Sequence, residues 1–287
     1  MWLDREALSN GLHRPADGIR DRPPALLHWD NPSGAEHLAT DVGSSQLETS
    51  IFRFPAASLQ RLKVEVSKCL GSEVPWVSTI DILTALIWSA VISAEMTSDA
   101  GIAVARSLHR TGGAQLMRIP VNFRSLHEPP LPEYYLGAAF AISLVRAEEE
   151  DLISIAANSG THSPSLLIPA LARVAAAVRT AVSAIDGESV KAAVEYIAAQ
   201  EDLGGLKLSP KPAKVSIVSW AAEHVYGLEW GREVGRCESV RLPELNGKRY
   251  PIILPRLPNG DFEVLVRHDL ETMGLLRQGW VTNIGKG

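Results

Sequence analysis

The chain of 287 residues has the length of one large domain or two modest ones. Hydrophobic residues make up 46% of it and charged residues 21%, so enough apolar surface is available to form a core and global disorder is excluded. The 28 basic and 33 acidic side chains give a net charge of -5, which provides no attractive field for a polyanion. We therefore expect no nucleic acid partner.

The cysteine content and the apolar segments bear on the compartment. Cys69 and Cys237 are too few for a disulfide framework, which favours a reducing environment. The N-terminus lacks the basic-then-apolar run of a signal peptide. The most apolar window, residues 166–185, contains one proline and two arginines, and a charge at bilayer depth is costly. We expect a cytoplasmic protein with no membrane span and no membrane partner.

Hydrophobic patterning divides the chain near residue 45. Residues 1–45 contain prolines and glycines without helical or strand periodicity, which predicts an extended arm. Patterning begins at residues 51–54, whose alternation predicts a strand, and continues over 57–70 with helical spacing. We expect one compact domain over residues 46–287.

The clearest helix start in the sequence lies at Ser78. Its hydroxyl is at an N-cap and the Asp81 carboxylate follows three residues later, where both meet unpaired backbone N–H groups. The apolar residues that follow cover more than one face. This pattern predicts a largely buried core helix that ends near Ala94.

The remaining elements alternate in type along the chain. Strands are predicted at 116–123, 135–145, 215–220, 250–254 and 262–266, and helices at 166–185, 189–200 and 270–276. The Asn259-Gly260 pair, which tolerates positive φ, predicts a hairpin turn between the last two strands. A mixed order of helices and strands predicts an α/β or α+β fold.

Several common catalytic and cofactor motifs are absent from the sequence. It contains no G-x-G-x-x-G after a strand, no Walker loop, no C-x-x-C, no H-E-x-x-H and no G-x-S-x-G, so we expect no metal site. An H-x-x-x-D spacing occurs at His13 and Asp17, and again at His37 and Asp41. Such a pair can supply a general base and its orienting carboxylate. Both lie in the unpatterned arm, so chance spacing is the preferred interpretation and the catalytic residues are not assigned.

Four segments of the chain carry recognisable motifs in a fixed order. The segments are Ser78-Thr79-Ile80-Asp81 through Trp88, Val121-Asn122-Phe123-Arg124 with the following Pro129 to Gly137 stretch, Ser219-Trp220, and Leu228-Glu229-Trp230-Gly231-Arg232. They resemble the S-T-x-D helix, V-x-x-R stretch, S-W strand and D-F-G-W-G region of the BAHD acyltransferases, especially of their fungal branch of trichothecene 3-O-acetyltransferases. Glu229 stands in place of the aspartate of the last motif.

The resemblance implies an α/β fold like that of chloramphenicol acetyltransferase, a mixed sheet with flanking helices. It covers about residues 45–280 and corresponds to the C-terminal portion of the family's enzymes. In this register the N-terminal half-domain is missing, and the family's catalytic H-x-x-x-D-G motif is expected upstream of Met1. His13 and Asp17 then fall in a variable arm.

The same resemblance implies an activity and a set of site residues. Family enzymes transfer an acyl group from acyl-CoA, a cosubstrate rather than a bound cofactor, to a small-molecule alcohol or amine. It implies that Arg124 pairs with Glu229 in a structural motif that includes Trp230 and Gly231. Ser219 and Trp220 would line the substrate channel, where hydrogen-bond donors can stabilise an oxyanion. The alternative interpretation of these last two is a satisfied hydroxyl and a core indole.

Three functional hypotheses therefore remain open at this point. The first is an acyl-CoA-dependent O-acyltransferase of fungal secondary metabolism that transfers an acetyl group to a hydroxyl, intact or truncated. The second is a non-catalytic remnant that binds a metabolite, coenzyme A or a partner domain. The third keeps catalysis and recruits His13 and Asp17 as a displaced base pair. The histidines without an assigned role are His109, His162, His224 and His268.

Overall fold

The computed structural model describes residues 46–98, 113–132, 135–159, 164–200, 213, 215–243 and 250–281. The chain divides into two compact units. Of the described residues, unit 1 contains 118–132, 135–144 and 181–200, and unit 2 contains the others. The single domain that the sequence predicted over 46–287 stays a prediction. The predicted arm, 1–45, lies outside the described residues.

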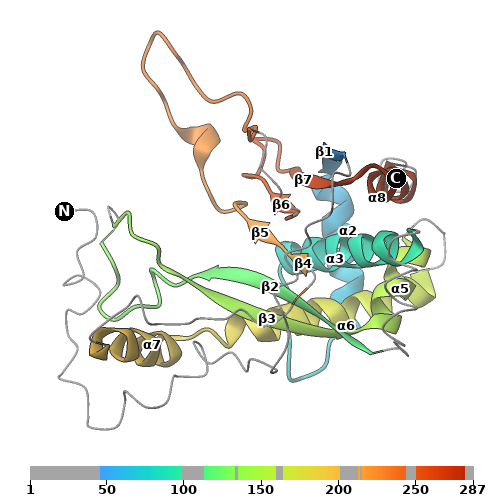
Figure 1. Ribbon diagram of the computed structural model, residues 1–287, viewed down its shortest axis with the longest axis horizontal. Helices are drawn as coiled ribbons and strands as arrows, with labels where there is room; N and C mark the ends of the chain where they lie inside the picture. Colours follow the sequence, from blue (N-terminus) through green and yellow to red (C-terminus); the bar gives the residue numbers. More distant parts are fainter. Residues whose placement is uncertain are drawn as a thin grey trace. The chain divides into compact units, whose positions relative to one another are not determined.

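The elements combine helices with two sheets (Figure 1). The strands are β1 (Leu47–Phe54), β2 (Ala114–Asn122), β3 (Phe140–Glu148), β4 (Val215–Ser216), β5 (Val218–Ser219), β6 (Ile252–Ile253) and β7 (Phe262–Asp269). The helices are α2 (Ala56–Ser67), α3 (Thr79–Thr97), α5 (Glu149–Asn158), α6 (Pro164–Ser183), α7 (Gly187–Ala199), α8 (Leu270–Val281) and the 3-10 helix η2 (Val225–Gly227). This composition confirms the α/β class.

One sheet has the strand order β1-β7-β6-β5 and the other β3-β2-β4. In the first, β7 is antiparallel to both β1 and β6, while β5 runs parallel to β6, so the sheet is mixed as expected. The turn between β6 and β7 contains Gly260 with φ +89°, a conformation that favours glycine. The hairpin predicted from Asn259-Gly260 is therefore confirmed.

Helix α3 is the core helix of unit 2. A capping box between Ser78 and Asp81 starts it, as the sequence predicted. Its residues are apolar around the whole circumference, and it packs against α2, α5 and α8. Trp88 is the largest of its fully buried side chains. Burial on several sides explains why the hydrophobic pattern of this segment covers more than one face.

Asp81 joins the start of α3 to α6. Its Oδ2 accepts hydrogen bonds from the Ser78 backbone N–H at 2.6 Å and from Nη2 and Nε of Arg179 at 2.6 and 2.8 Å. The Arg179 guanidinium also stacks over the Trp76 ring, with Cζ 4.3 Å from the ring centroid. Because the Asp81 side chain is only 3% exposed, these donors replace the water that would otherwise stabilise the carboxylate.

Unit 1 has a small core of its own. Ala141 of β3 packs with Ile185 and with Val190 of α7. The Ser143 hydroxyl donates to the Ala181 carbonyl at 2.5 Å and links β3 to the end of α6. Helix α7 starts at an Asp186 N-cap, which confirms the break predicted there.

Three elements differ from the sequence prediction. The strand predicted at 135–145 begins at Phe140, because Tyr135 and Gly137 hydrogen bond to Arg124 and stay in a loop. The strand predicted at 215–220 is divided into β4 and β5, which belong to different sheets. Helix α5 was not predicted because it has no side-chain N-cap; its acidic first turn is the signal that favours it.

Two helices are long and apolar enough to cross a membrane, α3 over Thr79–Thr97 and α6 over Ser165–Ser183. Such length and composition are weak evidence, because core helices share them. α3 is mostly buried, and α6 carries Arg173 and Arg179, each paired with an aspartate. The absence of a membrane span stays a prediction.

Asp261 caps helix α2 from a distant part of the chain. Its Oδ1 accepts the Ala56 backbone N–H at 2.8 Å, because the N-cap residue Pro55 offers no side-chain acceptor. This hydrogen bond lowers the pKa of Asp261 below its ordinary value; burial opposes the shift, and Arg53 and Asn259 add to it. The hairpin turn is thereby tied to α2.

The first prediction concerns Asp81. We expect Asp81→Ala to lower the free energy of unfolding by about 3–5 kcal/mol, because it leaves the Arg179 guanidinium half-buried without its carboxylate and removes the cap of α3. The matched control is Asp151→Ala, whose partner on α6, Arg173, is 62% exposed, so the loss should be about 1 kcal/mol or less. If urea denaturation gave equal losses of unfolding free energy for Asp81→Ala and Asp151→Ala, the role given to Asp81 would be contradicted.

The second prediction concerns the pH dependence of the Asp261 cap. A carboxylate with a depressed pKa contributes stability that is present above its unfolded pKa of about 3.9 and is lost as pH falls through the folded value. We expect wild type to exceed Asp261→Asn in unfolding free energy by about 1 kcal/mol at about pH 6, and the difference to shrink toward about pH 3. A difference independent of pH would exclude an ionised cap.

Candidate functional site

The segment from Val215 to Ser219 passes from one sheet to the other. Its first strand, β4, belongs to the three-stranded sheet, and its second, β5, lies at the edge of the four-stranded sheet. Ile217 between them is fully buried and anchors the crossing. This segment therefore holds the predicted Ser219-Trp220 pair at a sheet edge in a fixed register.

Ser219 presents two hydrogen-bond donors at this edge. The N–H groups of Val218 and Trp220 donate to Pro251 O at 3.1 Å and Ile253 O at 2.8 Å. Successive peptide groups of a strand point to opposite sides, so the Ser219 N–H faces away from β6. Its side chain is exposed, and Oγ accepts only a long 3.4 Å contact from the Ala221 N–H. A hydroxyl and a backbone N–H side by side are groups that can stabilise an oxyanion.

Trp220 lies partly buried beside them. Its ring packs against the cluster formed by Ile252, Leu254 and Leu265, on the face of the four-stranded sheet. The packing interpretation accounts for the buried part of the indole. A place for Ser219 and Trp220 in a substrate channel stays a prediction.

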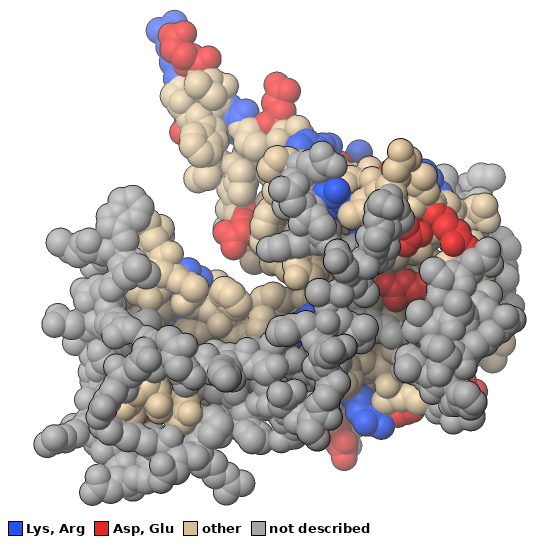
Figure 2. Space-filling model, in the orientation of Figure 1, with Lys and Arg blue, Asp and Glu red and all other residues tan. Residues whose placement is uncertain are grey.

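Residues 221–243 form a segment that we call the projecting loop. Figure 1 shows it leaving β5 and extending away from β6 and β7 before it returns. Val240 and Leu242 at the end of this loop pack on the same cluster as Trp220, the residue just before the loop. Both ends of the projecting loop are therefore anchored. Figure 2 shows basic and acidic side chains gathered at its tip.

The middle of the projecting loop contains the predicted structural motif. Glu229 and Arg236 form an antiparallel bridge, and the Trp230 N–H donates to Gly235 O at 2.8 Å. Gly231 has φ +86° and Gly235 φ +76°, both left-handed, which explains glycine at these positions. The Trp230 side chain is 58% exposed, so this motif leaves apolar surface open.

Arg124 closes a proline-rich loop in unit 1. Its Nη2 donates to Gly137 O at 2.7 Å, Nε to Tyr135 O at 3.5 Å and Nη1 to the Asn122 side chain at 3.2 Å. A Cβ at Gly137 would collide with the Tyr135 hydroxyl, so any other residue there would require the Tyr135 side chain to shift. The V-x-x-R arginine therefore organises the Y-L-G stretch that follows it.

The predicted pair of Arg124 and Glu229 joins residues of different units. Within its own unit, Glu229 binds Arg236, with Oε1 2.5 Å from Nη2, and Arg124 binds the loop carbonyls described above. The interunit pair stays a prediction. His13 and Asp17 lie outside the described residues, and so do His109 and His162.

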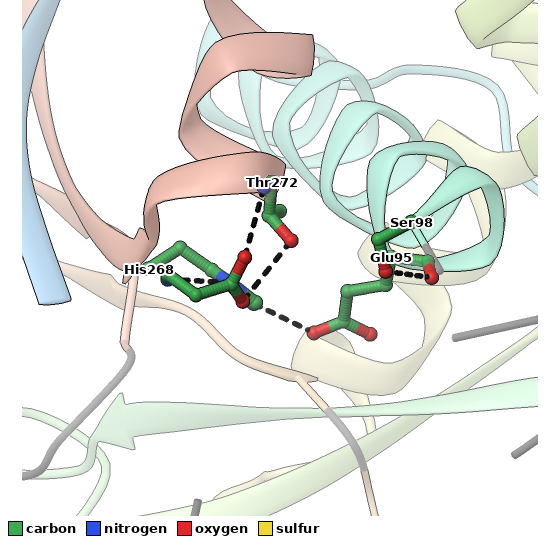
Figure 3. Close-up of polar contacts among 5 residues, drawn as sticks. Glu95, Ser98, His268 and Thr272 are labelled. Carbon is green, nitrogen blue, oxygen red and sulfur yellow. Dashed lines mark hydrogen bonds and ion pairs between the residues drawn. The ribbon is translucent and has the colours of Figure 1, made fainter. Parts of the chain in front are cut away.

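No role was expected for His268 from its sequence neighbours. In the structure its buried ring lies at the centre of a polar cluster. It lies near Glu95, Asp269 and Thr272, from three different elements (Figure 3). Burial alone raises the pKa of Asp269, but the hydrogen bonds from Thr272 and the charge of His268 outweigh it, so that pKa lies below its ordinary value. The adjacent His-Asp dipeptide was the one signal available in the sequence.

Among the described residues, no group of three or more His, Cys, Asp and Glu side chains could hold a metal ion. What the described part of the site offers is hydrogen-bond donors, groups that can polarise a carbonyl oxygen.

A family model described as the Transferase family matches residues 30–278. The chain belongs to this family. The match confirms the resemblance to BAHD acyltransferases that the four sequence segments indicated.

Curated relatives agree with the family assignment. O-acetyltransferase pboB of Aspergillus ustus is 26% identical over 222 residues, which cover 75% of this chain and 44% of that protein. O-acetyltransferase astG of Aspergillus oryzae is 25% identical over 274 residues, covering 85% of this chain and 52% of that protein. The chain thus spans about half the length of these relatives.

Solved structures show the same fold. F. sporotrichioides TRI101, complexed with coenzyme A and T-2, has a TM-score of 0.66 and 18% identity, and the likeness covers 99% of this chain and 57% of that one. F. graminearum TRI101, complexed with coenzyme A and deoxynivalenol, has a TM-score of 0.65, 18% identity and coverage of 98% and 57%. The fold expected from the resemblance is therefore confirmed.

The third prediction tests the pair of Arg124 and Glu229. If the family pair forms, a double-mutant cycle of Arg124→Met and Glu229→Gln gives a coupling of about 1 kcal/mol or more in unfolding free energy. The control cycle is Arg236→Met with Glu229→Gln, an exposed pair expected to couple by about 0–1 kcal/mol. A coupling free energy of zero between Arg124 and Glu229 would show that the interunit pair does not form.

Proposed function

We propose that this chain supplies the C-terminal half of an acyl-CoA-dependent O-acyltransferase, which transfers an acetyl group to a hydroxyl of a fungal secondary metabolite. The observation that carries the proposal is the family match over residues 30–278. The curated relatives named O-acetyltransferases support acetyl transfer to oxygen. The TRI101 structures that contain coenzyme A support acyl-CoA as the cosubstrate, with a small-molecule alcohol as the acceptor.

The reaction needs a base, a thioester and an oxyanion site. The acceptor oxygen attacks the thioester carbonyl while a general base takes its proton. The tetrahedral intermediate then breaks its C–S bond, and the base returns that proton to the coenzyme A thiolate. We propose that the Ser219 hydroxyl and N–H donate to the oxygen that becomes negative in the intermediate. The base that the resemblance implies is the histidine of H-x-x-x-D-G, which none of the described residues matches.

Because none of the described residues supplies the H-x-x-x-D-G base that the resemblance implies, we propose that turnover needs a domain that carries this motif. The projecting loop supports this proposal, since Leu228, Trp230 and Val234 expose half or more of their side chains. Exposed apolar side chains grouped on one segment are typical of an interaction site. We also propose a cytoplasmic location, which the two free cysteines, Cys69 and Cys237, support.

The fourth prediction concerns turnover. We expect the chain alone to release little coenzyme A from acetyl-CoA with a panel of alcohols, and a fusion with the N-terminal half of pboB to release it readily. A general base contributes about 10²–10⁴-fold, which is the difference expected. Robust turnover of the chain alone that His13→Ala abolishes would instead support the displaced base pair of His13 and Asp17.

Within the active fusion, Ser219→Ala should lower kcat by about 10²-fold, the usual effect of losing one oxyanion donor, with little change in KM. Ser216→Ala, on the same segment in β4, is the matched control and should keep full activity. Equal effects of the two variants would exclude Ser219 from the chemistry. Coenzyme A binding by the fusion without any turnover would support the alternative, a non-catalytic binding remnant.

A further inference from the structure

Both ring nitrogens of His268 face carboxylates. Nδ1 lies 2.6 Å from Asp269 Oδ2 and Nε2 lies 3.0 Å from Glu95 Oε1, and the His268 side chain is 5% exposed. A neutral imidazole has one N–H and one lone pair, so only the doubly protonated ring donates to both carboxylates. Figure 3 shows the ring between α3 and the start of α8.

Nδ1 has a second neighbour that requires the opposite state. The backbone N–H of Asp269 lies 3.0 Å from Nδ1 and can donate to it only when that nitrogen carries no proton. In the neutral ring, Nε2–H still donates to Glu95, but the Nδ1 lone pair faces Asp269 Oδ2. The proton on Nδ1 therefore decides whether the ring attracts or repels the Asp269 carboxylate.

The same Asp269 carboxylate caps helix α8. Its Oδ1 accepts the Thr272 backbone N–H at 2.9 Å, and its Oδ2 accepts the Thr272 hydroxyl at 3.1 Å. Glu95 lies in the last turn of α3, on the other side of the ring. A change at Nδ1 thus reaches the N-terminus of α8 through one shared carboxylate.

We propose that His268 is a proton-dependent clamp, which ties α8 to α3 when the ring is doubly protonated and loosens the start of α8 when Nδ1 loses its proton. This device is independent of the proposed transferase activity. We therefore expect α8 to be more ordered when the buried His268 ring is charged than when it is neutral.

The charged groups around His268 show which of them the ring can contact. The elements around the ring carry further charged groups, which are Glu48 and Arg53 on β1, Glu263 and Arg267 on β7, Glu271 and Arg277 on α8, and Asp81 on α3. Glu48 stands opposite His268 in the β1–β7 register, and its carboxylate already pairs with Arg277. Asp269 and Glu95 are therefore the two carboxylates that the ring contacts.

Amide hydrogen exchange of α8 tests the clamp. We compare the exchange rates of residues 270–281 in wild type and His268→Gln at the same pH, so that intrinsic exchange cancels. Where the ring is doubly protonated the variant should exchange about tenfold faster, the effect of one lost charge-assisted hydrogen bond, and the ratio should fall as the pH is raised and Nδ1 loses its proton. His224→Gln, a matched substitution at an exposed histidine, should give a ratio of one throughout.

A ratio that does not change with pH would overturn the proposal, because it would show a packing role without a proton. A second measurement applies to wild type alone, in case the variant does not fold. With ¹⁵N-labelled protein, the Thr272 amide resonance should move together with the His268 Nδ1 resonance as Nδ1 loses its proton. A Thr272 resonance that ignores the ring titration would also overturn it.

Discussion

The organisation of unit 2 depends on the charge of Asp81. One carboxylate completes the capping box of α3 and receives the Arg179 guanidinium of α6, and the same guanidinium covers the Trp76 ring. A buried carboxylate is tolerated only where donors replace the water that it has lost. The direction of α3 and the position of α6 are therefore linked. The helices that pack on α3, which are α2, α5 and α8, depend on the same arrangement.

The crossing at Ile217 connects this framework to the oxyanion site that we propose at Ser219. A strand that leaves one sheet after two residues and joins another must expose an edge, and Ser219 is the residue on that edge. Its free N–H and hydroxyl are held by the register of β5 against β6 rather than by a flexible loop. Rigid placement of donors is what an oxyanion site requires, since donors that reorganise during reaction contribute less.

Polar groups on the other side of unit 2 have a different role. His268 is buried, Asp269 and Glu95 are partly buried, and the three are hydrogen bonded to one another and to the α8 N-terminus. Asp269 is the residue before α8 and caps it locally, whereas α2 lacks a local side-chain cap and receives one from the distant Asp261. In both cases a carboxylate at the end of a strand or turn supplies the acceptor for the first N–H groups of a helix.

The sequence by itself determined the features governed by near neighbours: the capping box at Ser78, the turn at Asn259-Gly260, most helices and strands, and the family motifs. Only the tertiary structure decided that residues 215–220 divide between two sheets, that Tyr135 stays in a loop, and that His268 meets Glu95, 173 positions away. Periodicity and capping report hydrogen bonds within a few residues. The pairing of distant polar groups depends instead on how the elements pack, which no local pattern encodes.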